Sequence, residues 1–196
     1  DTTGKVITDS YKVIGYSNGF VFLRFGDYIG IVDINTDVLF RYFHISLMND
    51  RNFDVLFKGE DLHIVNSDNF NIHLLTWKQY LSKKPVKTIL LSENILTNVF
   101  WKDQNSILYS RSGETIVQQY NLKNKTSSTF YTHTIPIRFI AYDENSRLLV
   151  VEDGFAAHLV NPDFRSIISS HPWPASLAGN SSPINIRGDI IWQGVD

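Results

Sequence analysis

The chain has 196 residues, of which 43% are hydrophobic and 19% charged, and its 18 basic and 20 acidic side chains give a formal net charge of -2. This composition excludes a disordered chain and an overall field that would attract nucleic acid or anionic lipid. The absence of cysteine excludes disulfides, thiolate metal ligands and cysteine nucleophiles, and no apolar run approaches the roughly 20 residues of a bilayer-spanning helix.

Short apolar runs separated by polar turns fill the chain from residue 13 to residue 192. Aromatic residues make up 13% of the chain and β-branched residues are frequent, which favours strands over helices. The turns contain Gly, Asn, Asp and Ser, which is typical of antiparallel hairpins. We therefore expect an all-β protein. The expected strands are residues 13–16, 20–25, 28–34 and 38–44; 53–57, 62–65, 70–77 and 86–91; 98–102, 107–111, 115–122 and 127–133; 137–142, 147–151, 155–160 and 164–169; and 184–187 and 190–192.

These strands group into four units of four, followed by two strands of a fifth. The third strands of the four units place Val32, Leu75, Tyr120 and Leu159 at spacings of 43, 45 and 39 residues. A four-stranded repeat of about 40–45 residues is the signature of a propeller blade. We expect one domain over residues 1–196, a β-propeller-like array of about four to five four-stranded antiparallel blades, as a segment of a longer chain. A β-sandwich is the alternative, because its turns have similar spacing.

The segment FWKDQNSILY at residues 100–109, followed by YNLKN at residues 120–124, resembles the TolB-type, WD-repeat-like blades of bacterial propellers. In such blades an apolar strand, an Asp-containing turn, a second strand and a Tyr-Asp-Leu-like third strand follow one another. The resemblance extends over residues 13–192 as a pattern. The Gly-His and Trp-Asp pairs of true WD repeats are absent, and the Ser-Pro-Asp-Gly turn of the TolB type is only echoed at residues 103–105 and 143–145.

No histidine stands at a spacing typical of a zinc site, so we interpret each as an ordinary strand or turn residue. His63 and His73 lie on adjacent expected strands and could meet, but the sequence suggests no further ligand. The six histidines are His44, His63, His73, His133, His158 and His171.

Acidic pairs occur in three expected hairpin turns, at Glu60-Asp61, Asp143-Glu144 and Glu152-Asp153. Asp is common there because its side chain accepts local backbone hydrogen bonds; acid–base chemistry or calcium binding is the alternative. The chain has no nucleophile elbow, phosphate loop or dinucleotide fingerprint. We expect no enzymatic activity, no cofactor and no metal site.

The first candidate partner-binding segment follows the fourth unit, where Pro172 and Pro174 flank Trp173. An exposed Trp held between prolines is a good anchor for a partner. The alternative is that Trp173 packs against the edge of its own sheet.

The second candidate segment surrounds Pro85, where Trp77 and Tyr80 are interleaved with Lys83 and Lys84. Aromatic and basic side chains in this combination can bind an acidic partner or nucleic acid. A solvated connection between units is the alternative, and we expect no direct binding of nucleic acid.

The leading functional hypothesis is a non-enzymatic module that binds a protein or a small ligand, with a homo-oligomer compatible with that role. By fold analogy it could be the extracytoplasmic sensor domain of a membrane-anchored bacterial transcriptional regulator, which slightly favours a periplasmic location over the cytoplasm. The alternatives are the accessory propeller of a peptidase or hydrolase and a cytosolic WD-type scaffold.

Two structural expectations complete the interpretation. Phe22, Leu56, Leu108 and Leu149 are expected core positions. The N-terminal segment Val6-Ile7-Thr8 could pair with the strands at residues 184–192 and close a ring, which would remove an exposed sheet edge.

Overall fold

The computed structural model describes residues 12–17, 20–25, 28–36, 38–44, 53–58, 61–67, 71–76, 78–79, 87–90, 96–143, 146–172, 184–187 and 190–193. This part of the chain is almost entirely β-strand, as expected from its composition. None of its helical residues forms a segment of the length and apolarity that crossing a bilayer requires.

Each strand expected from the sequence is present, with ends that differ by a few residues. The strands are β1 (Lys12–Ser17), β2 (Phe20–Phe25), β3 (Tyr28–Asp33), β4 (Val38–His44), β5 (Phe53–Lys58), β6 (Asp61–Ser67), β7 (Asn71–Thr76), β8 (Lys87–Leu90), β9 (Leu96–Asp103), β10 (Ser106–Arg111), β11 (Ile116–Asn121), β12 (Thr126–Thr132), β13 (Phe139–Asp143), β14 (Leu148–Glu152), β15 (Ala156–Asn161), β16 (Ser166–Pro172), β17 (Ile184–Arg187) and β18 (Ile190–Gln193).

The strands form four separate four-stranded sheets, β1–β4, β5–β8, β9–β12 and β13–β16, and the two-stranded sheet β17–β18. Within each sheet, consecutive strands pair antiparallel, so every sheet is a simple meander. This confirms the four-strand repeat unit that the sequence predicts.

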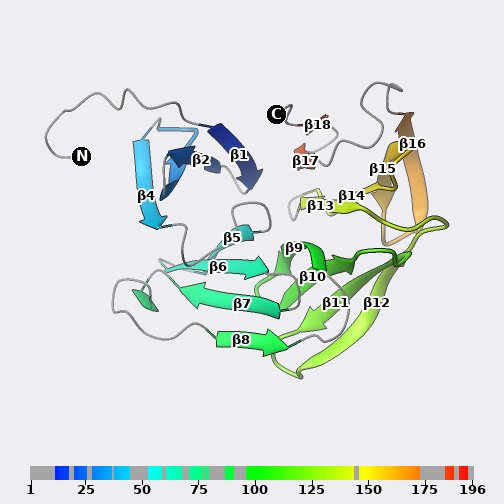
Figure 1. Ribbon diagram of the computed structural model, residues 1–196, viewed down its shortest axis with the longest axis horizontal. Helices are drawn as coiled ribbons and strands as arrows, with labels where there is room; N and C mark the ends of the chain where they lie inside the picture. The colour runs from blue at the N-terminus through cyan, green and yellow to red at the C-terminus, as the bar shows by residue number, and fades with distance from the viewer. Residues whose placement is uncertain are drawn as a thin grey trace, which may run out of the picture.

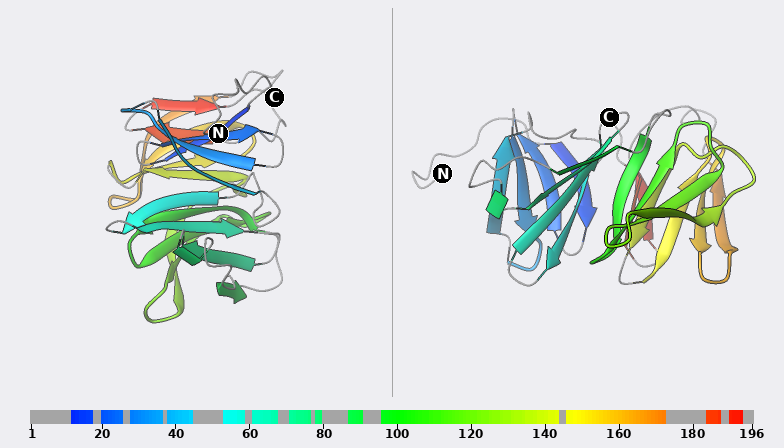
Figure 2. Two further views of the ribbon diagram at one scale, coloured as in Figure 1. Left: turned by 90° about the vertical axis from the view of Figure 1, so that its left-hand side faces the viewer. Right: turned by 90° about the horizontal axis from the view of Figure 1, so that it is seen from below.

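The sheets follow one another in chain order about a common centre, each with its first strand inside and its last strand outside (Figure 1). The first strands contact one another: β9 packs against β5 and β13, β13 packs against β17, and β17 touches β1. In the right-hand view of Figure 2 the strands run roughly vertically, so the connections between them lie at the top and bottom.

The inner strands of the sheet β9–β12 are buried on both faces, whereas β12 is mostly exposed. Trp101, Ile107 and Tyr109 lie in a cluster with Leu56 and Ile72 of the preceding sheet. Their neighbours in sequence point the other way, and Leu108 lies in a second cluster with Ile140 and Leu149 of the next sheet. This two-sided packing explains why β10 is buried along five consecutive residues rather than alternately.

Polar side chains of the first strands link neighbouring sheets. The backbone N–H of Trp101 donates to Oδ2 of Asp54 at 2.8 Å, and the N–H of Ile140 donates to Oδ1 of Asn98 at 3.1 Å. Both acceptors are buried, and a buried backbone N–H without a partner is costly. These bonds therefore stabilise the joints between consecutive sheets.

The turn between the third and fourth strands has the same form in two of the sheets. Oδ1 of Asn121 accepts from the N–H groups of Lys123 and Asn124, and Oδ1 of Asn161 accepts from those of Asp163 and Phe164. Both turns end on a residue with positive φ, at 58° for Lys125 and 51° for Arg165. In the first sheet, Asp33 likewise accepts from the N–H of Asn35.

The core predictions are confirmed where they can be compared. Leu56 is 6% exposed, and Leu108 and Leu149 are fully buried. The side chain of Phe22 and the segment Val6-Ile7-Thr8, with the ring closure expected from it, lie outside the described part of the chain.

Candidate functional site

Three connections from two neighbouring sheets meet at one edge of the molecule. They are the β10–β11 turn, the β12–β13 connection and the β14–β15 turn. Backbone hydrogen bonds fix them together: the N–H of His133 donates to the C=O of Thr115 at 2.7 Å, and that of Ile137 donates to Glu114 at 2.7 Å. The N–H of Arg138 donates to the C=O of Glu152 at 2.8 Å, which joins the connection to the next sheet.

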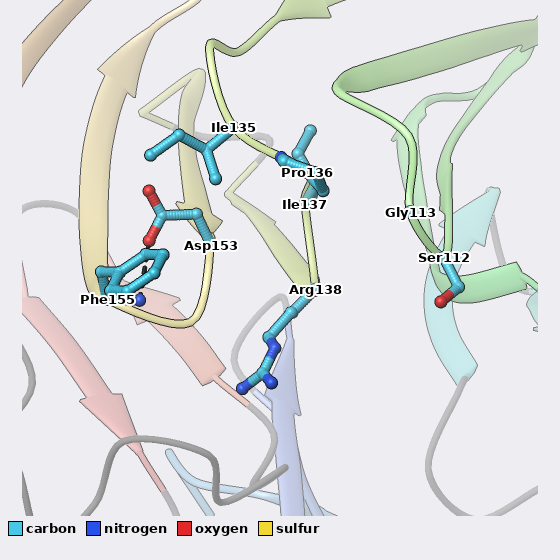
Figure 3. Close-up of a pocket in the computed structure, with 8 residues that line it drawn as sticks. All are labelled: Ser112, Gly113, Ile135, Pro136, Ile137, Arg138, Asp153 and Phe155. Carbon is cyan, nitrogen blue, oxygen red and sulfur yellow. Dashed lines mark hydrogen bonds between the residues drawn. The ribbon is translucent and has the colours of Figure 1, made fainter.

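A pocket of about 330 Å³ lies between these connections. Figure 3 shows Ile135, Asp153 and Phe155 on one side of it and Ser112 and Gly113 on the other, with the Arg138 side chain below. Its lining residues are Ser112, Gly113, Ile135, Pro136, Ile137, Arg138, Asp153 and Phe155.

The pocket rim combines exposed apolar side chains with one cation. Phe155 is 71% exposed and Ile135 is 37% exposed. Arg138 is exposed and, among the described residues, forms none of the ion pairs. A concave site with apolar walls and a few polar groups is the usual form of a ligand-binding site.

A glycine in the β14–β15 turn lies close to the arginine of the pocket. Gly154 has φ +91°, and a Cβ at this position would lie 3.1 Å from Nε and 3.2 Å from Cδ of Arg138. Glycine adopts positive φ without a steric cost and leaves room for the arginine side chain. The Arg138 side chain therefore packs closely against the turn at Gly154.

Behind the pocket wall, Asp153 binds two histidines. Its Oδ2 lies 3.2 Å from Nε2 of His133 and 3.0 Å from Nε2 of His158. The side chains of Asp153, His133 and His158 are 2%, 3% and 14% exposed, so the group is buried, with His158 nearest to solvent. We call these three residues the His-Asp-His cluster.

Two members of the His-Asp-His cluster, Asp153 and His158, are also held by hydrogen bonds from outside it. Oδ1 of Asp153 accepts from the N–H groups of Phe155 at 2.9 Å and Ala156 at 3.0 Å. Nδ1 of His158 lies 2.8 Å from Oγ of Ser170, which is its cross-strand partner in β16. The two imidazole rings are 4.8 Å apart. The side chains are therefore oriented before any ligand arrives.

The pKa of Asp153 reflects these contacts. Burial alone would raise it, but the N–H groups of Phe155 and Ala156 and the two histidines outweigh burial and lower the pKa to about 2. Burial also raises the pKa of Tyr131, whose ring lies beside His133. At neutral pH the cluster contains a carboxylate anion and the tyrosine is neutral.

The residues proposed from the sequence for partner binding fall mostly outside the described residues. These are Trp173, Pro174, Trp77, Tyr80, Lys83 and Lys84. Pro172 is described: it is exposed at the end of β16, opposite Ala156.

The other sequence-based expectations can be compared with the structure. His63 pairs with Thr76, and His73 pairs with Asn66, three residues further along β6. Since side chains alternate between the faces of a sheet, His63 and His73 point to opposite faces and do not meet. The expected turn role of Asp153 is confirmed by its bonds to Phe155 and Ala156.

Sequence reasoning missed the His-Asp-His cluster. His133 and Asp153 are 20 residues apart and belong to different sheets, so no short motif joins them. The one available signal was the position of His158, five residues after an acidic turn residue on a predicted hairpin. In comparisons with known proteins, no family model matches this chain and no curated protein matches it.

Proposed function

We propose that this chain is a non-enzymatic binding module whose sheets stack as blades of a β-propeller. The serial contacts of first strands and the burial of both faces of β10 support blade stacking, because the two sheets of a sandwich each bury one face. The sensing or scaffolding role expected from the sequence is compatible with this architecture.

The observation that carries the binding proposal is the pocket formed by the connections of two neighbouring sheets. Connections on a rigid β-scaffold are common positions for binding residues. Phe155 and Ile135 offer apolar contact area, and the guanidinium of Arg138 offers paired donors that fit a carboxylate. The pocket volume of about 330 Å³ is at the small end for ligand sites. The ligand that fits is a short protein segment with one carboxylate next to an apolar side chain.

The test is a titration of the isotope-labelled protein, followed by amide resonances. The probe is a pool of capped hexapeptides that place Asp or Glu next to Leu, Ile or Phe, and the matched pool carries Asn or Gln instead. We expect the acidic pool to shift the resonances of Ser112, Gly113 and Phe155, and the neutral pool to shift them less.

Matched variants separate the pocket from general surface effects. R138Q and F155S should lose most of the response. R165Q and F164S change an arginine and a phenylalanine that are also exposed, in the β15–β16 turn, and these variants should keep the response. Equal shifts with both pools, or a response that survives in R138Q and F155S, would contradict the proposal.

A further inference from the structure

The β14–β15 turn can be compared with its equivalent in the preceding sheet. In the ladders, Ser110 pairs with Val117 across the β10–β11 turn, and Val151 pairs with His158 across the β14–β15 turn. Aligning these pairs places Gly113 on Gly154, and both glycines have positive φ.

This alignment places Ser112 on Asp153 and Val117 on His158. Val117 is fully buried in the apolar core. A turn with the same glycine conformation therefore forms in the preceding sheet with Ser and Val at these ladder positions. Val117 faces the next sheet, whereas His158, the cross-strand partner of Val151, faces the preceding sheet and the β12–β13 connection that carries His133. A buried carboxylate with two imidazoles is costly compared with Ser and Val unless something is gained from it.

From the donor set and its geometry, we infer that His133, Asp153 and His158 bind a divalent transition-metal ion of the Zn²⁺ class. Two imidazole nitrogens and one carboxylate oxygen are the ligands that Zn²⁺ uses in sites with three protein ligands and one open position. The three candidate ligand atoms lie within 4.8 Å of one another.

The two nitrogen–oxygen separations are close to those between ligands of such an ion. Ligands at about 2.0–2.2 Å in a tetrahedral arrangement are roughly 3.4 Å apart. The Nε2 atoms of His133 and His158 lie 3.2 and 3.0 Å from Oδ2 of Asp153. An ion requires each nitrogen to move a few tenths of an ångström away from Oδ2, and the two nitrogens, which lie within 4.8 Å of each other, to reach the same spacing.

The surroundings of the ligands also fit a metal site. Metal-bound histidines usually donate their second ring N–H to a nearby acceptor, and metal-bound carboxylates accept further hydrogen bonds. In the hydrogen-bonded form, Nε2–H of His158 donates to Asp153, and Nδ1 accepts from the hydroxyl of Ser170. In the metal-bound form the proton is on Nδ1, which donates to Oγ of Ser170, while Nε2 binds the ion. A hydroxyl can serve both states because it both donates and accepts.

The position of the ion suits it to cross-link two neighbouring sheets. It would fix the β12–β13 connection, through His133, to the β14–β15 hairpin of the next sheet, through Asp153 and His158. Asp153 also lines the pocket. The fourth ligand is therefore a water molecule or a group of a molecule bound there. Mixed nitrogen and oxygen donors favour Zn²⁺, Co²⁺ or Ni²⁺ over Ca²⁺ and Mg²⁺, which prefer oxygen ligands.

The experiment is a calorimetric titration of the chelator-treated protein with ZnCl₂, repeated with CoCl₂ and MgCl₂. We expect one equivalent of Zn²⁺ or Co²⁺ to bind, a Co²⁺ absorption spectrum of four-coordinate type, and no response to Mg²⁺. With Zn²⁺ at about 100 times its Kd, the melting temperature should rise by roughly 5–10 °C.

Two variants locate the site, and one variant serves as the control. H158Q removes a ligand and should weaken binding more than S170A, which removes only the hydroxyl behind that ligand and should weaken binding about 10–100-fold. H73Q is the matched control, because Nδ1 of His73 likewise lies 3.1 Å from the hydroxyl of a cross-strand partner, Thr88. H73Q should bind Zn²⁺ as the wild type does.

Two results would overturn the inference. One is that neither Zn²⁺ nor Co²⁺ binds at millimolar concentrations to a folded wild-type protein. The other is that H158Q and S170A keep the wild-type affinity, because the ion would then bind elsewhere. Neither result depends on a peptide in the pocket, so this inference and the proposed peptide binding fail independently.

Discussion

The β10–β11 and β14–β15 turns occupy equivalent positions in two consecutive sheets but differ in chemistry. The first contains an ion pair between Arg111 and Glu114 at 3.5 Å on a partly exposed surface. The second buries Asp153 against His133 and His158. The repeat fixes the backbone of both turns and leaves their side chains free to differ, so a functional group can be identified as a departure between copies.

Substitutions in the core should destabilise the two sheets by similar amounts. Leu108 and Leu149 lie in one cluster between the two sheets, one from each sheet, and both are fully buried. We expect L108A and L149A each to lower the free energy of unfolding by about 2–5 kcal/mol, because each leaves a cavity between stacked sheets. Denaturant unfolding measures the loss. A cost below about 1 kcal/mol at either position would contradict two-sided packing.

The sequence predicted this repeat well because the hairpin turns are local. Asn121 and Asn161 occupy the same turn position in their units, and a side chain that accepts from the next backbone N–H groups produces the turn wherever it occurs. The joints made by Asp54 and Asn98 and the pairing of His133 with Asp153 depend on how sheets stack. Nothing local specifies them, so they were not predicted.

Low pH should reduce the stability that the β14–β15 turn contributes through Asp153, which has no counterpart in the β10–β11 turn. Because the folded pKa of Asp153 is lowered from 3.8 to about 2, its contribution to stability is complete above about pH 4 and is lost as the pH falls toward 2. In chelator, we expect the wild type to lose about 2 kcal/mol more than D153N between pH 5 and pH 2. Chemical denaturation at several pH values measures this difference. Parallel pH profiles for the two proteins would contradict the assignment.

Replacing Gly113 or Gly154 by alanine should lower the free energy of unfolding by two amounts that differ less than the effects above. G113A places a Cβ where no atom lies within 4 Å, so it should cost only the strain of positive φ, about 1 kcal/mol. G154A has the same strain and in addition requires the Arg138 side chain, 3.1 Å away, to shift, so it should cost somewhat more than G113A. Thermal melts of the two variants compare them directly. If G113A were the more destabilised, the packing of Arg138 over the turn would be wrong.

The His-Asp-His cluster can be removed by giving the β14–β15 turn the residues of the β10–β11 turn. The double variant D153S/H158V carries the residues that the β10–β11 turn has at these positions. We expect a β-rich circular dichroism spectrum like that of the wild type, since the preceding sheet folds with this turn, and no thermal stabilisation by Zn²⁺. Unfolding of the double variant would indicate that the His-Asp-His cluster is needed for the fold itself.

The most direct test of this difference is anomalous diffraction at the zinc edge from crystals grown with ZnCl₂. We predict one strong anomalous peak at about 2.0–2.2 Å from a ring nitrogen of His133, a ring nitrogen of His158 and a carboxylate oxygen of Asp153, and none at Ser112 in the equivalent turn. Crystals in zinc that show no peak at the cluster, with both histidines still hydrogen-bonded to Asp153, would contradict the account.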